Sequence, residues 1–335
     1  MPTAIFVDMA DTDTGVGEAM LADAGFTTRH LDTRDPDTIV GNAHDADALL
    51  VGYAPIDQDV VTRLPGLGIV SLLAAGVDNV DVDAVSGAGV WVANVPGVAT
   101  DDVATHALAL TLAMLRQVPQ YQQRAQTNWM GRGDYAPPKL SELTLGLIGL
   151  GQIGRRFADY ASPLFGRVIG YDPAVDPGSS QGGDTHQAAT TGQVSVTGLD
   201  EVVSQADVVS LHVPLTTQTA GMVDDAFLAA MKPGSYLVNV SRGGLVDSDA
   251  LAAALDRGHL RQAALDTIDV EPAPASHPLM GHDQVIVTPH VAYYSTFTET
   301  EYVRVQAHNV VSWWRDGEPT HCVGRPEHPR QRRAA

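Results

Sequence analysis

The sequence predicts an α/β fold made of two parallel sheets with helices on their faces. The chain has 335 residues, which is enough for two α/β domains, and 44% of them are hydrophobic, which is enough for two cores. Strand-like and helix-like segments alternate in two successive series. The second series opens with a glycine-rich turn, Gly149–Gly154, of the kind that joins strand to helix in Rossmann-like sheets.

The first series occupies about the first hundred residues. Its apolar, strand-like runs are Ala4–Val7, Ala48–Val51, Leu67–Leu73 and Val90–Val92, and helix-like segments lie near Gly17–Ala24 and Asp57–Leu64. Short apolar runs separated by helical segments are typical of parallel strands buried on both faces, so we expect one sheet here.

A long apolar-rich segment, Asp101–Arg116, follows and predicts a helix. Its two leading aspartates suit the positive end of the helix dipole, and Pro119 lies just beyond its expected end. The stretch Thr127–Lys139 is rich in Gly, Pro and Trp and predicts a loop.

The second series begins at Leu143. Its strand candidates are Thr144–Ile148, Arg167–Tyr171, Val208–His212, Tyr236–Val240, Ala263–Asp266 and Val285–Thr288. Between Pro173 and Gly198 the composition predicts a mobile surface segment in part of the range. We expect a last helix at about Ser295–Arg315, ending at Gly317, and a loose tail over Arg325–Ala335.

The charge balance is strongly acidic. The net charge is −20, with 32 Asp and 8 Glu against 18 Arg and two Lys. An ordinary acidic protein is one explanation; adaptation to a salt-rich cytosol, where self-repulsion is screened, is the one we favour. The same charge disfavours nucleic acid and anionic membranes as partners.

The chain carries no obvious targeting or membrane segment. No apolar stretch reaches the length of a bilayer span, and the first residues lack the pattern of a signal peptide. The single cysteine, Cys322, cannot form an internal disulfide. We therefore expect a cytoplasmic protein.

The turn Gly149-Leu150-Gly151-Gln152-Ile153-Gly154 matches the dinucleotide fingerprint GxGxxG in its expected context. It follows a predicted strand and opens a helix, and Asp172 stands at the end of the next strand, 21 residues after Gly151. Backbone N–H groups at such a helix start bind pyrophosphate. The alternative is a glycine-rich turn with only a packing role.

Asp172 bears on the choice of cofactor. A carboxylate there accepts hydrogen bonds from the ribose hydroxyls and repels a 2′-phosphate, which favours NAD(H) over NADP(H). Arg155, Arg156 and high salt would soften that repulsion, so NADP(H) stays open. Asp172-Pro173 as a simple turn is the other alternative.

Several motifs in order resemble the D-isomer-specific 2-hydroxyacid dehydrogenase family, from about Leu67 to Val323. They are Ala75–Asp81, Asn94–Gly97 with Thr100 and Val103-Ala104, Gly149–Gly154, Leu211–Thr216, Asn239–Gly244, Leu265-Asp266, Val270–Pro272, His277–Leu279 and Thr288–His290. One departure is Thr105, where the family usually carries an acidic residue; it puts a structural contact in doubt rather than the activity.

The resemblance implies a catalytic trio that reduces 2-keto acids to D-2-hydroxy acids with NAD(P)H. His290 would be the proton donor and Glu271 its partner, while Arg242 would bind the substrate's carboxylate and carbonyl. These residue types suit the roles: histidine exchanges protons near neutral pH, and arginine presents a permanently charged, planar fork.

The resemblance also implies binding residues. The N–H groups of Gly76 and Val77 would share the substrate carboxylate, and Asp266 would contact the nicotinamide carboxamide. The other residues expected along the cofactor are Thr100, Gly149, Gly151, Gln152, Ile153, Gly154, Asp172, His212, Pro214, Thr219 and Val240. The candidates for the substrate's side-chain pocket are Tyr53, Leu73, Ala74, Tyr293 and Tyr294.

Each of these residues also has an ordinary structural explanation when it is taken alone. His290 follows Thr-Pro and suits a turn, Glu271-Pro272 suits an exposed turn, and Arg242 suits a strand end or a phosphate contact. Asp266 suits a cap, Gly76 a tight turn, and the five pocket candidates suit core packing. The ordered set beside a cofactor fingerprint favours the functional interpretation. We find no metal-binding motif.

The resemblance further implies two Rossmann-like or flavodoxin-like domains separated by a cleft. Residues 1–98 and 291–335 would form a discontinuous substrate domain, and residues 99–290 the dinucleotide-binding domain. We expect hinge closure on substrate binding and a homodimer formed through the helix Asp101–Arg116.

Three alternatives within or near the family stay open at this point. Some relatives bind NAD as redox-sensing partners in transcription, but the acidic charge and the lack of extra interaction segments count against this role. Phosphoglycerate dehydrogenases often carry a further regulatory domain, for which we expect no room after Val323. Formate dehydrogenase has a glutamine where Glu271 stands.

Overall fold

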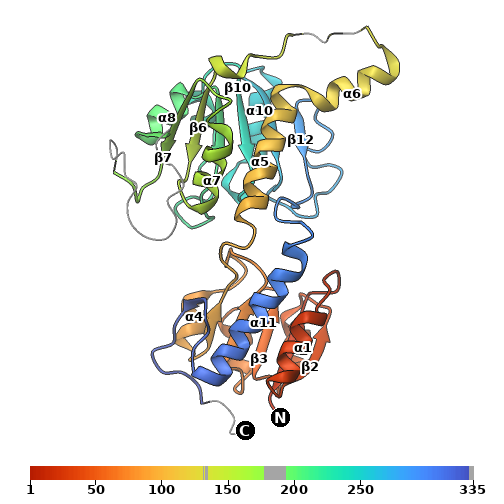
Figure 1. Ribbon diagram of the computed structural model, residues 1–335, viewed down its shortest axis with the longest axis vertical. Helices are drawn as coiled ribbons and strands as arrows, with labels where there is room; N and C mark the ends of the chain where they lie inside the picture. Colours follow the sequence, from red (N-terminus) through yellow and green to blue (C-terminus); the bar gives the residue numbers. More distant parts are fainter. Residues whose placement is uncertain (131, 133–134, 177–193, 332–335) are drawn as a thin grey trace. The chain divides into compact units, whose positions relative to one another are not determined.

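The computed structural model describes residues 1–130, 132, 135–176 and 194–331. The chain forms two compact units: unit 1 is Met1–Val98 with Tyr294–Ala335, and unit 2 is Ala99–Tyr293. Each unit has its own sheet with helices on both faces, which confirms the predicted class of two parallel-sheet α/β domains (Figure 1).

Unit 1 has a six-stranded sheet. From one edge to the other its strands are β13 (Cys322–Gly324), β5 (Trp91–Ala93), β4 (Ile69–Leu72), β3 (Ala48–Val51), β1 (Thr3–Val7) and β2 (Thr27–Leu31). All neighbours are parallel except β13 and β5, which are antiparallel. The order β2-β1-β3-β4-β5 is that of a flavodoxin-like sheet.

Helices cover both faces of this sheet because its central strands are apolar on both sides. On one face, α1 (Gly15–Asp23) packs beside α11 (Thr298–Asp316), so the last helix of the chain covers the first strands (Figure 1). The other face is covered by α2 (Pro36–Asn42), α3 (Gln58–Arg63) and α4 (Val82–Gly87).

Unit 2 has a seven-stranded sheet in which every pair of neighbours is parallel. Its order is β12 (Val285–Val287), β11 (Leu260–Leu265), β10 (Ser235–Asn239), β9 (Val208–Leu211), β6 (Thr144–Ile148), β7 (Arg167–Tyr171) and β8 (Val194–Val196). The direction of strand succession reverses between β6 and β9, and ligands of such sheets bind outside the carboxyl ends of the strands at this point.

The helices of unit 2 also form two layers. On one side α5 (Thr100–Leu115) packs against α7 (Gln152–Ala161) and against β10 and β11. On the other side α8 (Leu199–Gln205), α9 (Asp225–Ala230) and α10 (Ser248–Asp256) share a core with the strands. Two short 3-10 helices, Leu140–Glu142 and Gly243–Leu245, and the helix α6 (Val118–Thr127) complete the unit.

Several predicted elements differ from the structure. Strand β2 was absent from the prediction because its exposed and half-exposed side chains leave no apolar run. Pro119 lies beyond the end of the helix before it, α5, as expected, but it also lies in the first turn of α6, a helix that was not predicted, where its missing N–H costs nothing. Strand β8 lies inside the segment expected to be mobile, of which residues 177–193 fall outside the described residues.

The C-terminal tail was expected to be loose, and this prediction is wrong for its described part. The Arg330 guanidinium donates to the carbonyl oxygens of Val61, Leu64 and Ala88 at 3.0, 2.7 and 2.8 Å, and the N–H of Arg330 donates to Gly89 O at 2.9 Å. These carbonyls lie at the carboxyl ends of α3 and α4, so the described part of the tail is bound to the ends of two helices.

Among the described helices, none is both long and apolar enough to pass through a bilayer.

Candidate active site

The glycine-rich turn joins β6 to α7 at the point where the strand order reverses. Gly149 has φ +99°, and a Cβ there would lie 2.4 Å from the carbonyl oxygen of His212. A Cβ at Gly154 would lie 2.1 Å from the carbonyl oxygen of Gly149. Both positions therefore require glycine, because the turn, the helix and the loop after β9 approach one another closely.

The start of α7 is open. Gly151 is its N-cap, and a Cβ there would meet no atom within 4 Å, while Gln152 beside it is exposed. The first N–H groups of this helix have no partner within the helix and carry its positive dipole end. The turn thus fits the pyrophosphate of a dinucleotide.

Asp172 follows β7 and lies beside this turn. Its two carboxylate oxygens accept the N–H groups of Leu150 and Ala174, at 2.8 and 2.9 Å. A carboxylate oxygen accepts more than one hydrogen bond, so these contacts orient the group and leave it able to bind hydroxyls. Arg156 is held by Asp101 on α5, with Nε at 2.8 Å from Oδ1.

His212 follows β9 across the reversal point. Its ring is buried, which lowers the pKa from 6.5 to about 3, so the ring is neutral. Nε2 lies 3.0 Å from Ser210 Oγ, and within the described part of the chain the buried Nδ1 has no hydrogen-bond partner. A buried polar atom of this kind is usually satisfied by a ligand or water.

The other residues expected along the cofactor lie on the same edge. Thr219 Oγ1 donates to Pro214 O at 2.7 Å, which closes the turn after β9. Thr100, the first residue of α5, lies 3.4 Å from the side-chain oxygen of Gln152. Val240 directly follows β10 and is almost fully buried.

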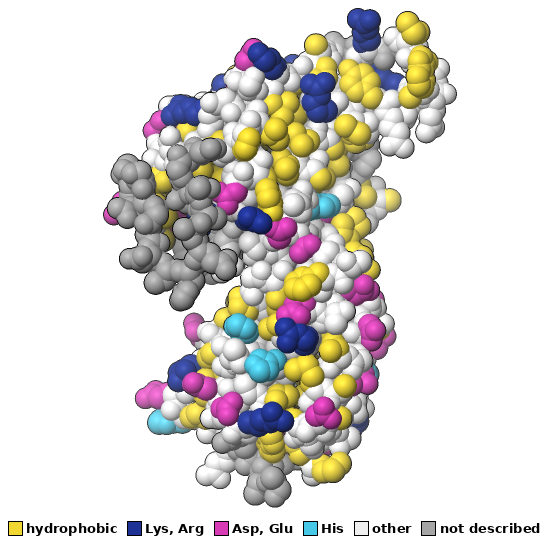
Figure 2. Space-filling view, viewed as in Figure 1, with side chains coloured by type: hydrophobic (Ala, Val, Ile, Leu, Met, Phe, Trp, Pro, Cys, Tyr) yellow, Lys and Arg dark blue, Asp and Glu magenta, His cyan; other side chains and the backbone are white. Residues whose placement is uncertain are grey.

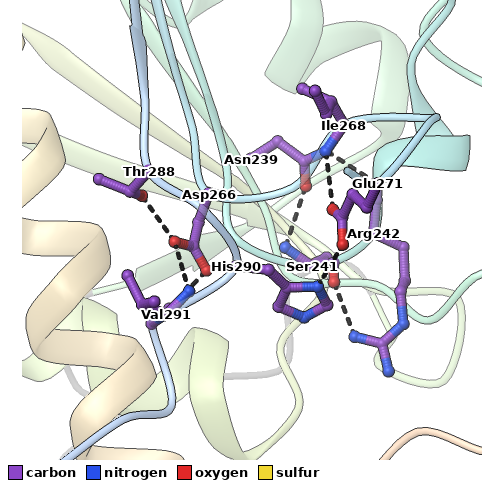
Figure 3. Close-up of polar contacts among 10 residues, drawn as sticks. Asn239, Ser241, Arg242, Asp266, Ile268, Glu271, Thr288, His290 and Val291 are labelled. Atoms are coloured by element: carbon purple, nitrogen blue, oxygen red, sulfur yellow. Dashed lines mark hydrogen bonds and ion pairs between the residues drawn. The ribbon is translucent and has the colours of Figure 1, made fainter. Parts of the chain in front are cut away.

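His290 and Glu271 are in direct contact (Figure 3). His290 Nδ1 lies 2.7 Å from Glu271 Oε2, and the other carboxylate oxygen of Glu271 accepts the N–H of Ile268 at 3.0 Å. The two side chains are 27% and 37% exposed, so the pair can be reached from solvent. Because Nδ1 faces a carboxylate, it is the ring nitrogen that carries the proton in the neutral imidazole.

Arg242 lies on the neighbouring loop after β10 (Figure 3). Its Nη1 donates to Ser241 O at 2.9 Å, and its carbonyl accepts Asn239 Nδ2 at 2.8 Å. A Cβ at Gly243 would lie 1.8 Å from the carbonyl carbon of Ile268. The loops that carry Arg242 and Glu271 therefore pack backbone to backbone, and glycine at 243 is what permits it.

Asp266, at the end of β11, organises the segment that carries His290. Its carboxylate accepts Thr288 Oγ1 at 2.6 Å and the N–H of Val291 at 3.0 Å (Figure 3). It also accepts the N–H of Ala292 at 2.9 Å. Burial would raise the pKa of Asp266, but these hydrogen bonds and one from His106 outweigh it and leave the pKa below 3.8.

His106 on α5 is a site residue that sequence reasoning missed. Its Nε2 lies 3.1 Å from Thr288 Oγ1 and 3.4 Å from Asp266 Oδ1. The only local signal is a histidine on a helix face that also carries the buried residues Val103 and Ala107. Its partners lie up to 182 residues away, so no local pattern predicts the contact.

The remaining predicted residues fall in different places. Tyr293 belongs to unit 2, and its ring centroid lies 6.4 Å from that of His290. Gly76, Val77, Tyr53 and Tyr294 belong to unit 1. Tyr294 is 60% exposed and its hydroxyl lies 3.3 Å from Glu299 Oε1, so it faces α11 in that unit.

In unit 1, the loop after β4 presents its backbone. The carbonyl of Ala74 accepts the N–H of Val95 at 2.9 Å, and that of Ala75 accepts Asn94 Nδ2 at 2.7 Å. Among the described residues, the N–H groups of Gly76 and Val77 donate to none. The loop therefore has a fixed shape and two N–H groups left for an acceptor.

No group of three His, Cys, Asp or Glu side chains that could hold a metal ion occurs among the described residues.

A fingerprint turn in a Rossmann-ordered sheet, with a His–Glu pair on the same edge, defines a nucleotide-dependent oxidoreductase type of site. A family model described as D-isomer specific 2-hydroxyacid dehydrogenase, NAD binding domain, matches residues 108–292. The chain belongs to the D-isomer specific 2-hydroxyacid dehydrogenase family, as its motifs predicted.

Individual relatives agree with this membership. A D-3-phosphoglycerate dehydrogenase of Mycobacterium tuberculosis is 40% identical over 264 residues, which are 78% of this chain and 48% of the relative. A glyoxylate reductase of Thermofilum pendens is 31% identical over 293 residues, covering 86% and 84% of the two chains. This chain thus spans about half the length of the mycobacterial relative.

A solved structure, D-lactate dehydrogenase from Aquifex aeolicus complexed with NAD and lactic acid, superposes with a TM-score of 0.85 at 26% identity. The superposition covers 97% of this chain and 100% of the other. The family model and this structure support a nicotinamide cofactor, and the open turn at Gly151 fits the pyrophosphate of such a cofactor.

Proposed function

We propose that this protein is an NAD(P)-dependent dehydrogenase that reduces 2-keto acids to D-2-hydroxy acids. The observation that carries the proposal is the 2.7 Å contact between His290 Nδ1 and Glu271 Oε2, in the same unit as the nucleotide turn. A carboxylate that fixes one imidazole nitrogen leaves the other as a proton donor of defined direction.

In this proposal each residue of the trio has one task. His290 gives the proton on Nε2 to the carbonyl oxygen, and Glu271 holds the ring and balances its positive charge. Arg242 binds the substrate's carboxylate and carbonyl, with its backbone fixed by Asn239 at 2.8 Å. The N–H groups of Gly76 and Val77 share the carboxylate.

The cofactor supplies the hydride when it is bound. On the protein side, the turn Gly149–Gly154 holds the pyrophosphate and Asp172 binds the ribose hydroxyls. Asp172 is oriented by Leu150 and Ala174, and Arg156 is engaged by Asp101, which supports a preference for NAD(H) over NADP(H).

Oligomeric state and environment are part of the same proposal. We expect a homodimer formed through α5 and the arm that follows it, which is α6 with residues 128–130. Trp129 and Met130 are each 82% exposed, and Figure 2 shows hydrophobic side chains on this arm. A monomer by light scattering would contradict this. We also expect a cytoplasmic, salt-adapted protein; a melting temperature that falls as KCl is added would contradict the adaptation.

The proposed function is tested by a panel of 2-keto acids assayed with NADH and NADPH, with chiral analysis of the product. We expect cofactor oxidation and the D-product. His290→Ala should lower kcat by about 10²- to 10⁴-fold with little change in cofactor affinity. His308→Ala, which changes an exposed histidine on α11, is the matched control.

No turnover with any keto acid would overturn the proposal and favour a role in nucleotide binding alone. An unchanged kcat in His290→Ala would remove His290 from the chemistry.

A further inference from the structure

We infer that the keto acid reduced by this protein carries an uncharged side chain, so that dicarboxylic and phosphorylated keto acids are poor substrates. The inference rests on the proposed function and names the substrate class of the same site. It comes from the loops at the carboxyl edge of the unit 1 sheet, where the neighbours of the Gly76–Val77 loop carry an excess of negative charge.

The loop after β3 is the immediate neighbour of the proposed carboxylate-binding loop. Asn79 Nδ2 donates to the carbonyl oxygens of Gly52 and Ala54, at 3.2 and 3.0 Å, and so ties the two loops together. Tyr53 lies between these two carbonyls and is 47% exposed. A substrate whose carboxylate binds at Gly76 and Val77 therefore has the Tyr53 loop beside it.

The next loop, after β1, supplies a carboxylate at the base of Tyr53. Asp8 Oδ2 accepts the N–H of Tyr53 at 3.1 Å, and a Cβ at Gly52 would lie 2.2 Å from the Asp8 carbonyl oxygen. The Asp8 side chain is only 15% exposed. This carboxylate is thus built into the edge rather than placed loosely on the surface.

The guanidinium over the Tyr53 ring, that of Arg34, is paired with the same carboxylate. Arg34 Nε lies 2.7 Å from Asp8 Oδ2, and the Arg34 guanidinium carbon lies 5.3 Å from the centroid of the Tyr53 ring. The contact over the ring also orients the tyrosine. Arg34 therefore helps to fix the shape of this edge and adds no net positive charge to it.

The wider edge has the same sign. The four loops that follow β1, β2, β3 and β4, residues 8–14, 32–35, 52–57 and 73–81, contain eight acidic residues and one basic residue, Arg34. A second negative group on the substrate would enter a negative potential here, whereas an alkyl or hydroxymethyl group would meet the exposed part of Tyr53.

The test compares substrates with carbon chains of the same length, using the purified full chain and its preferred cofactor. The pairs are 2-oxobutanoate against oxaloacetate, 2-oxopentanoate against 2-oxoglutarate, and hydroxypyruvate against phosphohydroxypyruvate. We expect kcat/KM to be at least about tenfold higher for the first member of each pair. The ratio should shrink between about 0.1 and 1 M salt, because the Debye length falls from about 10 Å to about 3 Å.

Asp8→Asn tests whether the negative charge of this edge causes the preference for uncharged side chains. Asp8 has φ +56°, a conformation that asparagine tolerates well, so the fold should be kept while Arg34 loses its counter-charge. We expect the relative kcat/KM for oxaloacetate and 2-oxoglutarate to rise about tenfold. Asp45→Asn is the control: it breaks a similar pair, Arg29 Nη2–Asp45 Oδ1 at 2.6 Å, ahead of the amino end of β3, and should leave the ratio unchanged.

A wild-type preference for the doubly charged acids would overturn this inference and leave the proposed function intact. The same conclusion would follow if Asp8→Asn moved the ratio no more than Asp45→Asn does. Absence of turnover with all six acids would overturn the proposed function, and this inference with it.

Discussion

Asp266 accepts hydrogen bonds from the backbone of His290 and of the two residues that follow it. The carbonyl oxygen of Asp266 accepts the N–H of His290 at 2.8 Å, and its carboxylate accepts the N–H groups of the next two residues, Val291 and Ala292. His290 has φ +53°, which is unfavourable for a residue with a side chain. These hydrogen bonds to Asp266 therefore stabilise the backbone conformation that directs the His290 imidazole to Glu271.

Asp266→Asn should weaken these hydrogen bonds, because one side-chain oxygen becomes an NH₂ group that faces N–H donors. We expect kcat to fall about 10- to 100-fold while the fold is kept.

His106→Leu should cause a smaller loss of kcat than Asp266→Asn, because it removes one hydrogen bond to Thr288. His106→Gln should keep most of the wild-type kcat, since glutamine keeps a donor near Thr288 Oγ1. Equal losses for leucine and glutamine would contradict a role for this hydrogen bond.

Glu271→Gln should separate charge from hydrogen bonding at the acid–base pair. Glutamine can still accept the N–H of Ile268, but it cannot balance a positive charge on His290. We expect kcat to fall about 10- to 100-fold and the basic limb of the kcat profile to move to lower pH. Glu318→Gln, at an exposed glutamate paired with Arg325, is the control. A profile that keeps its shape would leave Glu271 with only a structural role.

Gly243→Ala should disrupt the contact between the loops that carry Arg242 and Glu271. The added Cβ would lie 1.8 Å from the Ile268 carbonyl carbon, so the loop that carries Arg242 or the one that carries Glu271 must move. We expect a loss of about 3 kcal/mol or more in the free energy of unfolding, together with most of the activity. Gly87→Ala meets no atom within 4 Å and is the matched control in urea unfolding. Equal stability of the two variants would show that the loops adjust freely.

His212→Gln should reduce the acid sensitivity of unfolding. Burial lowers the pKa of His212 from 6.5 to about 3, so the unfolded ring binds a proton below pH 6.5 that the folded ring refuses until about pH 3. As the pH is lowered through that window, the free energy of unfolding should therefore decrease, by up to about 1.4 kcal/mol per pH unit. Urea unfolding at pH 7 and pH 5 should show a smaller difference for the variant than for the wild type. Equal differences would place the pKa of this ring near its ordinary value.

Asp172→Ser should shift cofactor preference. Serine keeps a hydroxyl for local hydrogen bonds and removes the negative charge that repels a 2′-phosphate. We expect the ratio of kcat/KM for NADPH to that for NADH to rise at least about tenfold. Asp225→Asn, at an exposed aspartate on α9, should leave the ratio unchanged. A wild-type enzyme that already prefers NADPH would contradict the assigned role of Asp172.

The sequence predicted most reliably those elements whose signal is local. Strands β6 and β7 begin and end where their apolar runs do, and the first and last fingerprint glycines, Gly149 and Gly154, lie where the backbone leaves no room for a Cβ. Strand β2 gave no such signal, because an edge strand with exposed side chains looks like a loop.

The contacts within the candidate site were less accessible. The pairing of His290 with Glu271 followed from family resemblance and from no spacing rule, since each residue has an ordinary turn explanation. The contact of His106 with Thr288 joins residues 182 positions apart and depends on how α5 packs against β11. Arg330 likewise binds helix ends more than 240 residues earlier, which no pattern in the tail announces.

The split of unit 1 between the two ends of the chain has a consequence for biosynthesis. Helix α11 and the Arg330 segment leave the ribosome after the whole of unit 2, yet α11 covers strands of the sheet made before unit 2 and buries Val303, Ala307 and Val310 against them. Unit 2 is continuous, so all of its strands are available earlier. We expect nascent chains that end near residue 293 to hold a protease-resistant second domain beside an amino-terminal sheet that still needs a chaperone.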